Sequence, residues 1–329
     1  MNHLQQALAH TATLGEGLSW QDNTESWWWT DIEAASLQNW KLGQAVVTYR
    51  LPDRLGSFVH CRSGRILLGL AKRLCFASLP KNAAVLASSA QLTTSATAAV
   101  QLTVQSLVAV DPAEPRTRVN DGRTDRRGYF VFGTMNEAPE KRPIASFYQF
   151  SMPYGLRRLA LPAVAIANSI CFSLDGKTMY FTDTLSRRIQ QCDYDAETAS
   201  VSNIRLFAIP EGDEAYPDGS VIDRNGCLWN AEWGAGTVAQ YASDGRCLQR
   251  LSVPTKNPTC PAFGGVNGDY LMVSSARQEM SAEELSSMPA SGSLFAMQMD
   301  APLAVADTLF DDSDAGSVLP LAPKTIKRQ

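Results

Sequence analysis

The chain has 329 residues, long enough for one large domain or two, and its 45% content of hydrophobic residues excludes a protein that is disordered throughout. A formal net charge of -4, without any long basic run, argues against nucleic acid or an anionic membrane surface as the main partner. The seven cysteines are odd in number and include no C-x-x-C pair, which argues against a disulfide framework and favours a reducing compartment.

The first residues, MNHLQQALAHTATLGEG, contain no basic segment followed by an apolar core, so the sequence predicts no secretory signal. No apolar run approaches the ~20 residues that a membrane-spanning helix needs. We therefore expect a cytoplasmic protein without membrane contact. Only three histidines are present, His3, His10 and His60, which excludes a zinc site built from three histidines at strand ends.

Six similar units follow one another along the chain. Each contains a strand-like segment, a turn with glycine and a second strand with bulky alternate residues, and Asn-Gly and Asp-Gly turns of this kind favour hairpins. Their spacing of roughly 40 to 65 residues is typical of a β-propeller, in which each blade is a four-stranded sheet. The sequence therefore predicts an all-β fold, one six-bladed β-propeller domain over residues 1–329 with terminal extensions at about 1–12 and 322–329. The units begin at Gly15, Gly56, Arg118, Asn168, Asp218 and Cys260.

Two stretches fit this repeat less well. The segment Leu79–Val110 is rich in Ala, Ser and Thr, and we expect it to supply outer strands of the second unit and the start of the third. The segment Glu279–Ser287 predicts a short helix or an insertion loop. The runs WWTD and YFTD end at Asp31 and Asp183, which we expect to tie neighbouring strands together by hydrogen bonds.

Polar residues head four of the units, at the position where the innermost strands of a propeller converge on its axis. Their carboxylate and amide oxygens suit Ca²⁺, Mg²⁺ or Mn²⁺, with positions left open for water and substrate. Taken singly, an Asn or Asp beside Gly is commonly a turn former, and a Glu beside Gly is compatible with a solvated position. Their recurrence at equivalent places favours a metal site in the central channel. The four residues are Glu16, Asn120, Asn168 and Asp218.

Arg118 lies two residues before Asn120, and therefore on the same face of an extended segment. Its guanidinium suits a carboxylate or several sugar hydroxyls, and a salt bridge to a nearby acid is the alternative interpretation. The sequence contains no G-x-S-x-G elbow and no phosphate-binding loop, and its cysteines lack a histidine partner for nucleophilic catalysis. These absences leave metal-assisted chemistry as the interpretation to test.

Several segments together resemble the SMP-30/gluconolactonase/regucalcin-like family. They span nearly the whole chain in the family's order. The resemblance implies a six-bladed β-propeller with one divalent metal ion in its channel, which agrees with the fold derived from the repeats. The segments are LGEGLSW (14–20), RVNDGRTDRRGYFVFGTM (118–135), ANSICFSLDGKTMYFTDT (167–184), YPDGSVIDRNGCLWNAEW (216–233) and CPAFGG (260–265).

The resemblance implies three metal ligands. The glutamate of the family's G-E-G motif matches Glu16, the asparagine of N-G-I-x-F-S-x-D-G matches Asn168, and the aspartate of P-D-G matches Asp218. In the family this aspartate is also taken as the catalytic base. The sequence departs from the family at Ser169, where a glycine usually follows the metal-binding asparagine.

The resemblance also implies substrate-binding residues. The arginine and asparagine of the family's R-x-N-D-G motif match Arg118 and Asn120. A substrate-binding glutamate that follows G-T-M in the family is matched by Glu137. These three residues would hold the hydroxyl groups of a sugar.

The activity implied by the resemblance is hydrolysis of a sugar-acid lactone to the aldonic acid, the lactone being gluconolactone, arabinonolactone or a related pentono- or hexonolactone. We expect one divalent ion, Ca²⁺ before Zn²⁺, Mn²⁺, Mg²⁺ or Fe²⁺, and a monomer or weak homo-oligomer whose partner is the small lactone. A metal-bound hydroxide is the alternative to Asp218 as the base. Two other functions stay open: a non-catalytic propeller that binds metal or protein, and an aryl-ester or organophosphate hydrolase on the same scaffold.

Overall fold

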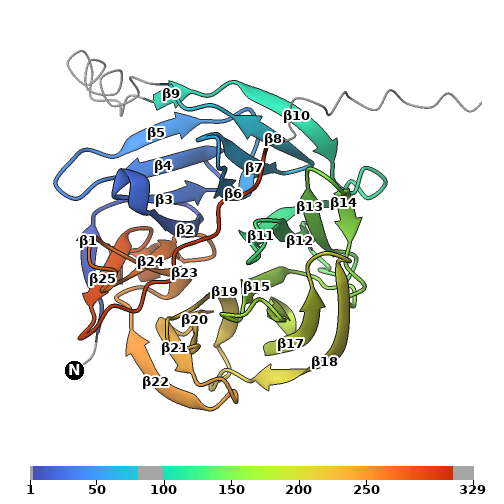
Figure 1. The fold of residues 1–329 in the computed structure, drawn as a ribbon. Helices are drawn as coiled ribbons and strands as arrows, with labels where there is room; N and C mark the ends of the chain where they lie inside the picture. The colour runs from blue at the N-terminus through green and yellow to red at the C-terminus, as the bar shows by residue number, and fades with distance from the viewer. Residues whose placement is uncertain (1–2, 81–98, 314–329) are drawn as a thin grey trace, which may run out of the picture.

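Six β-sheets surround a central axis in a computed structural model that describes residues 3–80 and 99–313 (Figure 1). Five of the sheets have four strands and one has five. Neighbouring sheets pack through clusters of buried hydrophobic side chains, so the core lies between the blades. The predicted all-β, six-bladed β-propeller is confirmed. Within the described ranges, no helix is both long and apolar enough to span a bilayer.

The first three sheets each begin with their innermost strand. The first sheet consists of β2 (Gly15–Gln21), β3 (Ser26–Asp31), β4 (Ser36–Trp40), β5 (Val47–Arg50) and β9 (Ala99–Gln101). The second consists of β6 (Leu55–His60), β7 (Ile66–Leu70), β8 (Arg73–Ala77) and β10 (Val104–Ala109). The third consists of β11 (Thr117–Thr124), β12 (Phe130–Asn136), β13 (Phe147–Ser151) and β14 (Gly155–Arg158).

The remaining sheets repeat this order. The fourth sheet consists of β15 (Ala167–Phe172), β16 (Thr178–Asp183), β17 (Arg188–Asp195) and β18 (Ser200–Ala208). The fifth consists of β19 (Tyr216–Ile222), β20 (Leu228–Trp233), β21 (Thr237–Tyr241) and β22 (Cys247–Ser252). The sixth consists of β23 (Asn257–Gly264), β24 (Tyr270–Ala276), β25 (Leu294–Gln298) and β1 (Gln5–Leu8). Short 3₁₀ helices follow β2 and β16, namely η1 (Asp22–Thr24) and η2 (Thr184–Ser186).

The sixth sheet joins the two ends of the folded chain. β1 pairs antiparallel with β25, with Gln5 opposite Ala296, so the outermost strand comes from the N-terminal segment. Part of segment 1–12, which the sequence predicts as a terminal extension, is thus a strand of this sheet. The pairing covers the edge of β25, which would otherwise expose unpaired backbone groups.

The predictions for the two segments that fitted the repeat poorly, Leu79–Val110 and Glu279–Ser287, are confirmed only in part. β10 is the outer strand of the second sheet, as predicted, but β9 pairs in parallel with β5 of the first sheet, and the third sheet begins only at Thr117. Residues 81–98 and the tail from Ala322 lie outside the described residues. The predicted short helix is α2 (Ala282–Ser287), which begins with a capping box between Ser281 and Glu284.

All six innermost strands carry one extra residue at the same place. In β2, Glu16 lies opposite Thr30 and the next paired residue, Ser19, lies opposite Trp28, so three steps on β2 match two on β3. The same shift occurs in the other innermost strands, β6, β11, β15, β19 and β23. Such a β-bulge bends the strand and re-aims the side chains beside it.

The bulges refine the predicted equivalence of the site residues. Asn168 lies opposite Thr182 as Glu16 lies opposite Thr30, so these two positions are equivalent. Asn120 and Asp218 each lie one residue further along, inside the bulge that begins at Val119 or Pro217. The prediction that all four residues share one position was therefore wrong by one residue for two of them.

Asp31 and Asp183 fix the backbone just ahead of two of these bulges. The carboxylate of Asp31 accepts hydrogen bonds from the N–H groups of Thr13 and Leu14, at 2.9 and 3.1 Å. The carboxylate of Asp183 accepts from the N–H groups of Ala165 and Ile166, at 3.0 and 3.1 Å. The structural role predicted for both aspartates is confirmed.

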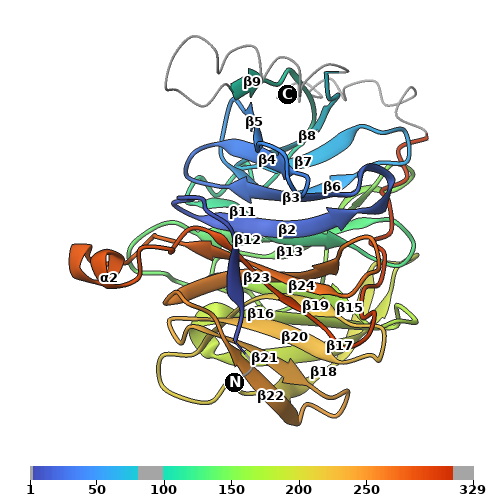
Figure 2. The same cartoon turned by 90° about the vertical axis from the view of Figure 1, so that its left-hand side faces the viewer.

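The C-terminal segment 303–313 crosses one end of the propeller axis (Figure 1). Its backbone bonds to the fifth sheet, where Arg224 N–H donates to the Leu303 carbonyl, and to the second sheet, where Phe310 N–H donates to the His60 carbonyl. Phe310 is fully buried and stacks on Phe150, with ring centroids 5.8 Å apart. Figure 2 shows α2 at one end of the axis and this segment at the other.

We expect Phe310→Ala to lower the free energy of unfolding by about 3–5 kcal/mol, because it leaves a cavity among packed aromatic rings. Urea unfolding followed by tryptophan fluorescence measures this loss. Leu42→Ala is the control, since Leu42 is 84% exposed and its truncation should change stability by less than about 0.5 kcal/mol. Equal effects of the two substitutions would contradict the anchoring role of Phe310.

Candidate metal and substrate site

A cavity of about 450 Å³ lies at one end of the propeller axis, within the size range of small-molecule sites. Gln278 and Glu279, which precede α2, lie at its rim, so the cavity faces the α2 end of the axis. Polar residues from five innermost strands, β2, β11, β15, β19 and β23, meet in it. Five of the six predicted site residues line the cavity, namely Glu16, Arg118, Asn120, Asn168 and Asp218. Apolar surface comes from Leu14, Met135, Ile166, Tyr216 and Trp233.

Hydrogen bonds fix which way the Asn168 amide faces. The hydroxyl of Thr184 donates to the Pro217 carbonyl at 3.0 Å, so its oxygen is free to accept from Asn168 Nδ2 at 2.9 Å. Asn168 Oδ1 therefore faces the opposite way, where it accepts from Asn120 Nδ2 at 3.0 Å. Thr184 directly follows the YFTD run, and no pattern in that run predicts its orienting role.

Asn120 links Arg118 to Asn168. Its Nδ2 donates to the Ala167 carbonyl and to Asn168 Oδ1, and its Oδ1 accepts from Arg118 Nη1 at 2.7 Å. Both polar groups of Asn120 are thus bonded to protein. Arg118 is only 4% exposed, and its Nε, which has no hydrogen-bond acceptor among the described residues, lies 3.6 Å from the Glu137 carboxylate in an ion pair.

Glu16 and Asp218 form a buried acidic pair whose side chains share a hydrogen bond. Asp218 is 4% exposed, while Glu16 keeps part of its surface open to the cavity although protein surrounds it. Burial is the main cause that raises the pKa of Glu16 to about 8, with repulsion from Asp121 as the next cause. Burial and then repulsion from Glu16 raise the pKa of Asp218 well above its usual range. Without a cation, the pair therefore retains a proton near neutral pH.

Glu137 lies behind Arg118, and the residues that line the cavity do not include it. Its carboxylate forms an ion pair with Arg54, with Oε1 at 2.6 Å from Nη1, and Oε1 is 3.6 Å from Arg118 Nε. Its backbone N–H donates to the Arg116 carbonyl. Glu137 is therefore placed to neutralise two guanidinium groups, and its contact with substrate stays a prediction.

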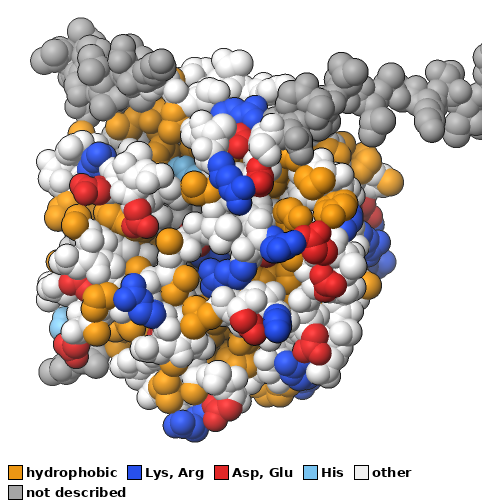
Figure 3. All heavy atoms as spheres, viewed as in Figure 1, with side chains coloured by type: hydrophobic (Ala, Val, Ile, Leu, Met, Phe, Trp, Pro, Cys, Tyr) orange, Lys and Arg blue, Asp and Glu red, His pale blue; other side chains and the backbone are white. Residues whose placement is uncertain are grey.

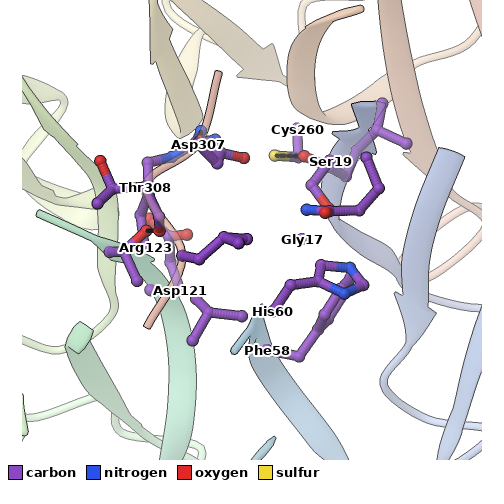
Figure 4. Close-up of a pocket in the computed structure, with 15 residues that line it drawn as sticks. Gly17, Ser19, Phe58, His60, Asp121, Arg123, Cys260, Asp307 and Thr308 are labelled. Carbon is purple, nitrogen blue, oxygen red and sulfur yellow. Dashed lines mark hydrogen bonds and ion pairs between the residues drawn. The ribbon is translucent and has the colours of Figure 1, made fainter. Parts of the chain in front are cut away.

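A second, much smaller cavity of about 30 Å³ lies at the other end of the axis (Figure 4). Asp307 and Thr308 of the C-terminal segment cover it, and Arg123 Nη1 donates to Asp307 Oδ1 at 2.8 Å. This volume holds one or two water molecules and no sugar. On this face acidic and basic side chains are interspersed without a continuous patch of one sign (Figure 3). We infer that a ligand of the larger cavity enters from the α2 end.

The fold and the site together define a six-bladed β-propeller with an acid- and amide-lined cavity on its axis. The family model of the SMP-30/gluconolactonase/LRE-like region matches residues 14–277. The chain belongs to this family, as the motifs in the sequence predicted.

Named relatives and a solved structure extend this comparison. An L-arabinolactonase of Azospirillum brasilense is 41% identical over 289 residues, which cover 87% of this chain and 88% of the relative. A 6-deoxy-6-sulfogluconolactonase of Pseudomonas putida is 29% identical, with 88% and 93% of the two chains covered. The structure of a calcium-binding protein, regucalcin, from Agrobacterium tumefaciens superposes with a TM-score of 0.80 at 26% identity and covers 94% of this chain and 97% of its own.

The residues present fit a divalent cation of the oxygen-binding kind. Two carboxylates and the Oδ1 atom of Asn168 offer hard oxygen donors, and Arg118 offsets less of the cost of charging Glu16 than burial and Asp121 add. In the described part of the chain, no cluster joins three or more His, Cys, Asp or Glu side chains in a metal-binding arrangement, so the amide is essential to the proposed set. Two carboxylates with one amide leave coordination positions for water and substrate.

We expect the cation-free protein to lose thermal stability as the pH rises from about 5 to about 8. Folding raises the pKa of Glu16 from an ordinary 4.5 to about 8, so in this window the folded state binds a proton that the unfolded state has released. Glu16→Gln removes this titration and should flatten the fall in Tm by a few degrees. Melting curves in EDTA at several pH values measure the difference.

The matched control for this experiment is Glu283→Gln, which changes an exposed glutamate of α2. Its pH profile should follow that of the unmodified protein. Parallel profiles for all three proteins would contradict the raised pKa of Glu16.

Proposed function

We propose that this protein hydrolyses a sugar-acid lactone to the aldonic acid with the help of one divalent cation. The observation that carries the proposal is the meeting of a buried carboxylate pair, an oriented amide oxygen and a buried guanidinium in one cavity. The relatives named L-arabinolactonase and 6-deoxy-6-sulfogluconolactonase support a cyclic sugar ester as substrate. Because the first of these is 41% identical, arabinonolactone is the first substrate to test, followed by gluconolactone.

Glu16, Asn168 and Asp218 would hold the cation, and Ca²⁺ is the first candidate because of the calcium-binding regucalcin structure. When bound, a divalent cation supplies polarisation of the lactone carbonyl and lowers the pKa of nearby water. The bond to Thr184 holds Asn168 Nδ2 and leaves Oδ1 on the other side of the amide, where it accepts from Asn120 Nδ2 and has a second lone pair to offer a cation. Such preorganisation lowers the free energy needed to assemble the site.

Asp218 is proposed as the proton carrier of the reaction. Its carboxylate accepts a proton from the water that attacks the lactone carbonyl, and returns it to the ring oxygen as the carbon–oxygen bond breaks. The new carboxylic acid then ionises at neutral pH. Burial and Glu16 raise the pKa of Asp218 in the cation-free protein, which favours the protonated acid. A bound cation would favour the carboxylate form that can accept a proton, while weakening it as a base. The alternative base is water near the cation, whose pKa a bound cation would lower.

Arg118 is proposed to bind the sugar hydroxyls or the ester oxygen through the part of its guanidinium that lines the cavity. Asn120 would hold the guanidinium in place, and it contacts substrate only if one of its hydrogen bonds to protein is exchanged. Glu137 would act through Arg118 by fixing its charge and orientation. The apolar wall that includes Tyr216 and Trp233 suits the carbon–hydrogen faces of a sugar ring.

Two other functions have different consequences. A non-catalytic propeller that binds metal or protein would release no acid from any lactone, with or without chelator. An aryl-ester or organophosphate hydrolase would act on those esters faster than on aldonolactones.

We expect Asp218→Ala to reduce kcat/KM for aldonolactones by at least about 100-fold, because it removes both a cation ligand and the proton carrier. Proton release from a panel of lactones, with each divalent cation added in turn to chelated protein, measures activity. Circular dichroism checks that the variant folds. Asp244→Ala, which alters an exposed hairpin turn, is the control and should retain full activity. Full turnover by Asp218→Ala would overturn the proposed role.

A further inference from the structure

Ser169 occupies a backbone conformation that side chains disfavour. Its φ is +59°, in the left-handed region, and it directly follows the proposed ligand Asn168. The equivalent residue in β2 is Gly17, which follows Glu16 and has φ of +60°. Both bulges therefore require the same left-handed residue after the ligand, and glycine meets this requirement without steric strain. A serine at position 169 therefore needs an interaction that offsets the cost of its left-handed backbone.

The hydroxyl of Ser169 makes buried hydrogen bonds that offset this cost. It is fully buried and donates to the backbone carbonyl of Asp218 at 2.6 Å. The same oxygen accepts from Asn230 Nδ2 at 3.0 Å and from the Ser220 hydroxyl at 3.1 Å. Asn230 Nδ2 also lies 3.1 Å from the Asp218 carbonyl, so two donors hold this one oxygen.

These bonds join two strands that carry different ligands. Ser169 lies in β15 beside Asn168, and the carbonyl that it binds belongs to Asp218 itself in β19. These bonds fix the position of the Asp218 main chain relative to Asn168, and the side chains that make them do not line the cavity. Gly17 has no side chain that could make such a link, although a Cβ atom there would meet only ordinary contacts of 3.5 Å or more.

We propose that Ser169 is a positioning residue that sets the separation of Asn168 and Asp218, and so raises the affinity of the site for a divalent cation. This inference rests on the proposed function, because it assigns a role within the same site. The hydroxyl exerts its effect through the Asp218 main chain and touches neither cation nor substrate. In metal sites such supporting groups typically change affinity by about 10- to 100-fold.

Two substitutions distinguish the effect of the Ser169 hydroxyl from the effect of its backbone strain. Ser169→Ala removes the hydroxyl and keeps a side chain in the left-handed region, whereas Ser169→Gly removes the hydroxyl and relieves the strain. We expect both variants to bind Ca²⁺ and Mn²⁺ at least about tenfold more weakly by calorimetry. Thermal stability should fall clearly only in Ser169→Ala, so that Ser169→Gly remains informative if the alanine variant folds poorly.

Ser275→Ala is the matched control. Ser275 is also fully buried, and its hydroxyl donates to the Ser293 carbonyl at 2.7 Å in the sixth sheet, outside the ligand set. We expect this variant to lose thermal stability while its cation affinity and its kcat/KM for arabinonolactone stay within about twofold of those of the unmodified protein.

The outcomes distinguish the role of Ser169 from the proposed function. Weaker cation binding in Ser169→Gly at nearly unchanged Tm supports the positioning role. Cation affinity within twofold of the unmodified protein in both Ser169 variants overturns it while leaving the lactonase proposal intact. If the unmodified protein binds neither Ca²⁺ nor Mn²⁺ and opens no lactone, both proposals are overturned together.

Discussion

The extra residue in each innermost strand is the constraint on which the site depends. In a regular strand, successive side chains point to opposite faces of the sheet. Its backbone would pass the axis without turning a polar side chain towards it. The bulge breaks this alternation at one place. Side chains can therefore reach the cavity from the residue at the start of the bulge in some blades and from the next residue in others. Side-chain bonds between neighbouring bulges, such as those from Asn120 and Ser169, then connect the strands around the channel.

This arrangement buries charged and polar groups that lower the stability of the fold. Glu16 and Asp218 are held together in a site where burial and mutual repulsion raise the pKa of both. A packed apolar pair would be more stable there, and the strained backbone of Ser169 adds a further destabilising feature. Proteins commonly break local stability rules at functional positions and compensate elsewhere. Here the compensation comes from the aromatic core between blades and from the closure of β1 on β25.

Much of the architecture was predictable because its causes are local. Hairpin turns with glycine, alternating bulky residues and a recurring unit specify blades wherever they occur, and the two strand-end aspartates, Asp31 and Asp183, took their predicted places. The site residues were recognisable as polar groups at the start of each innermost strand. The predictions failed where a distant partner decides the outcome. The local sequences of β1 and β9 do not indicate which sheet each strand joins, because their partner strands lie far away along the chain.

The sequence by itself determined the number of blades, the identity of the converging polar residues and the family, since composition, turns and motifs are properties of neighbouring residues. Only the tertiary structure decided that Asn120 and Asp218 lie one residue beyond Glu16 and Asn168, because strand register is a relation between two strands. It also decided that Glu137 pairs with Arg54 behind the cavity. The carboxylate pair, the orienting Thr184 and the bond from Ser169 to Asp218 equally depend on contacts between blades, which no local pattern encodes.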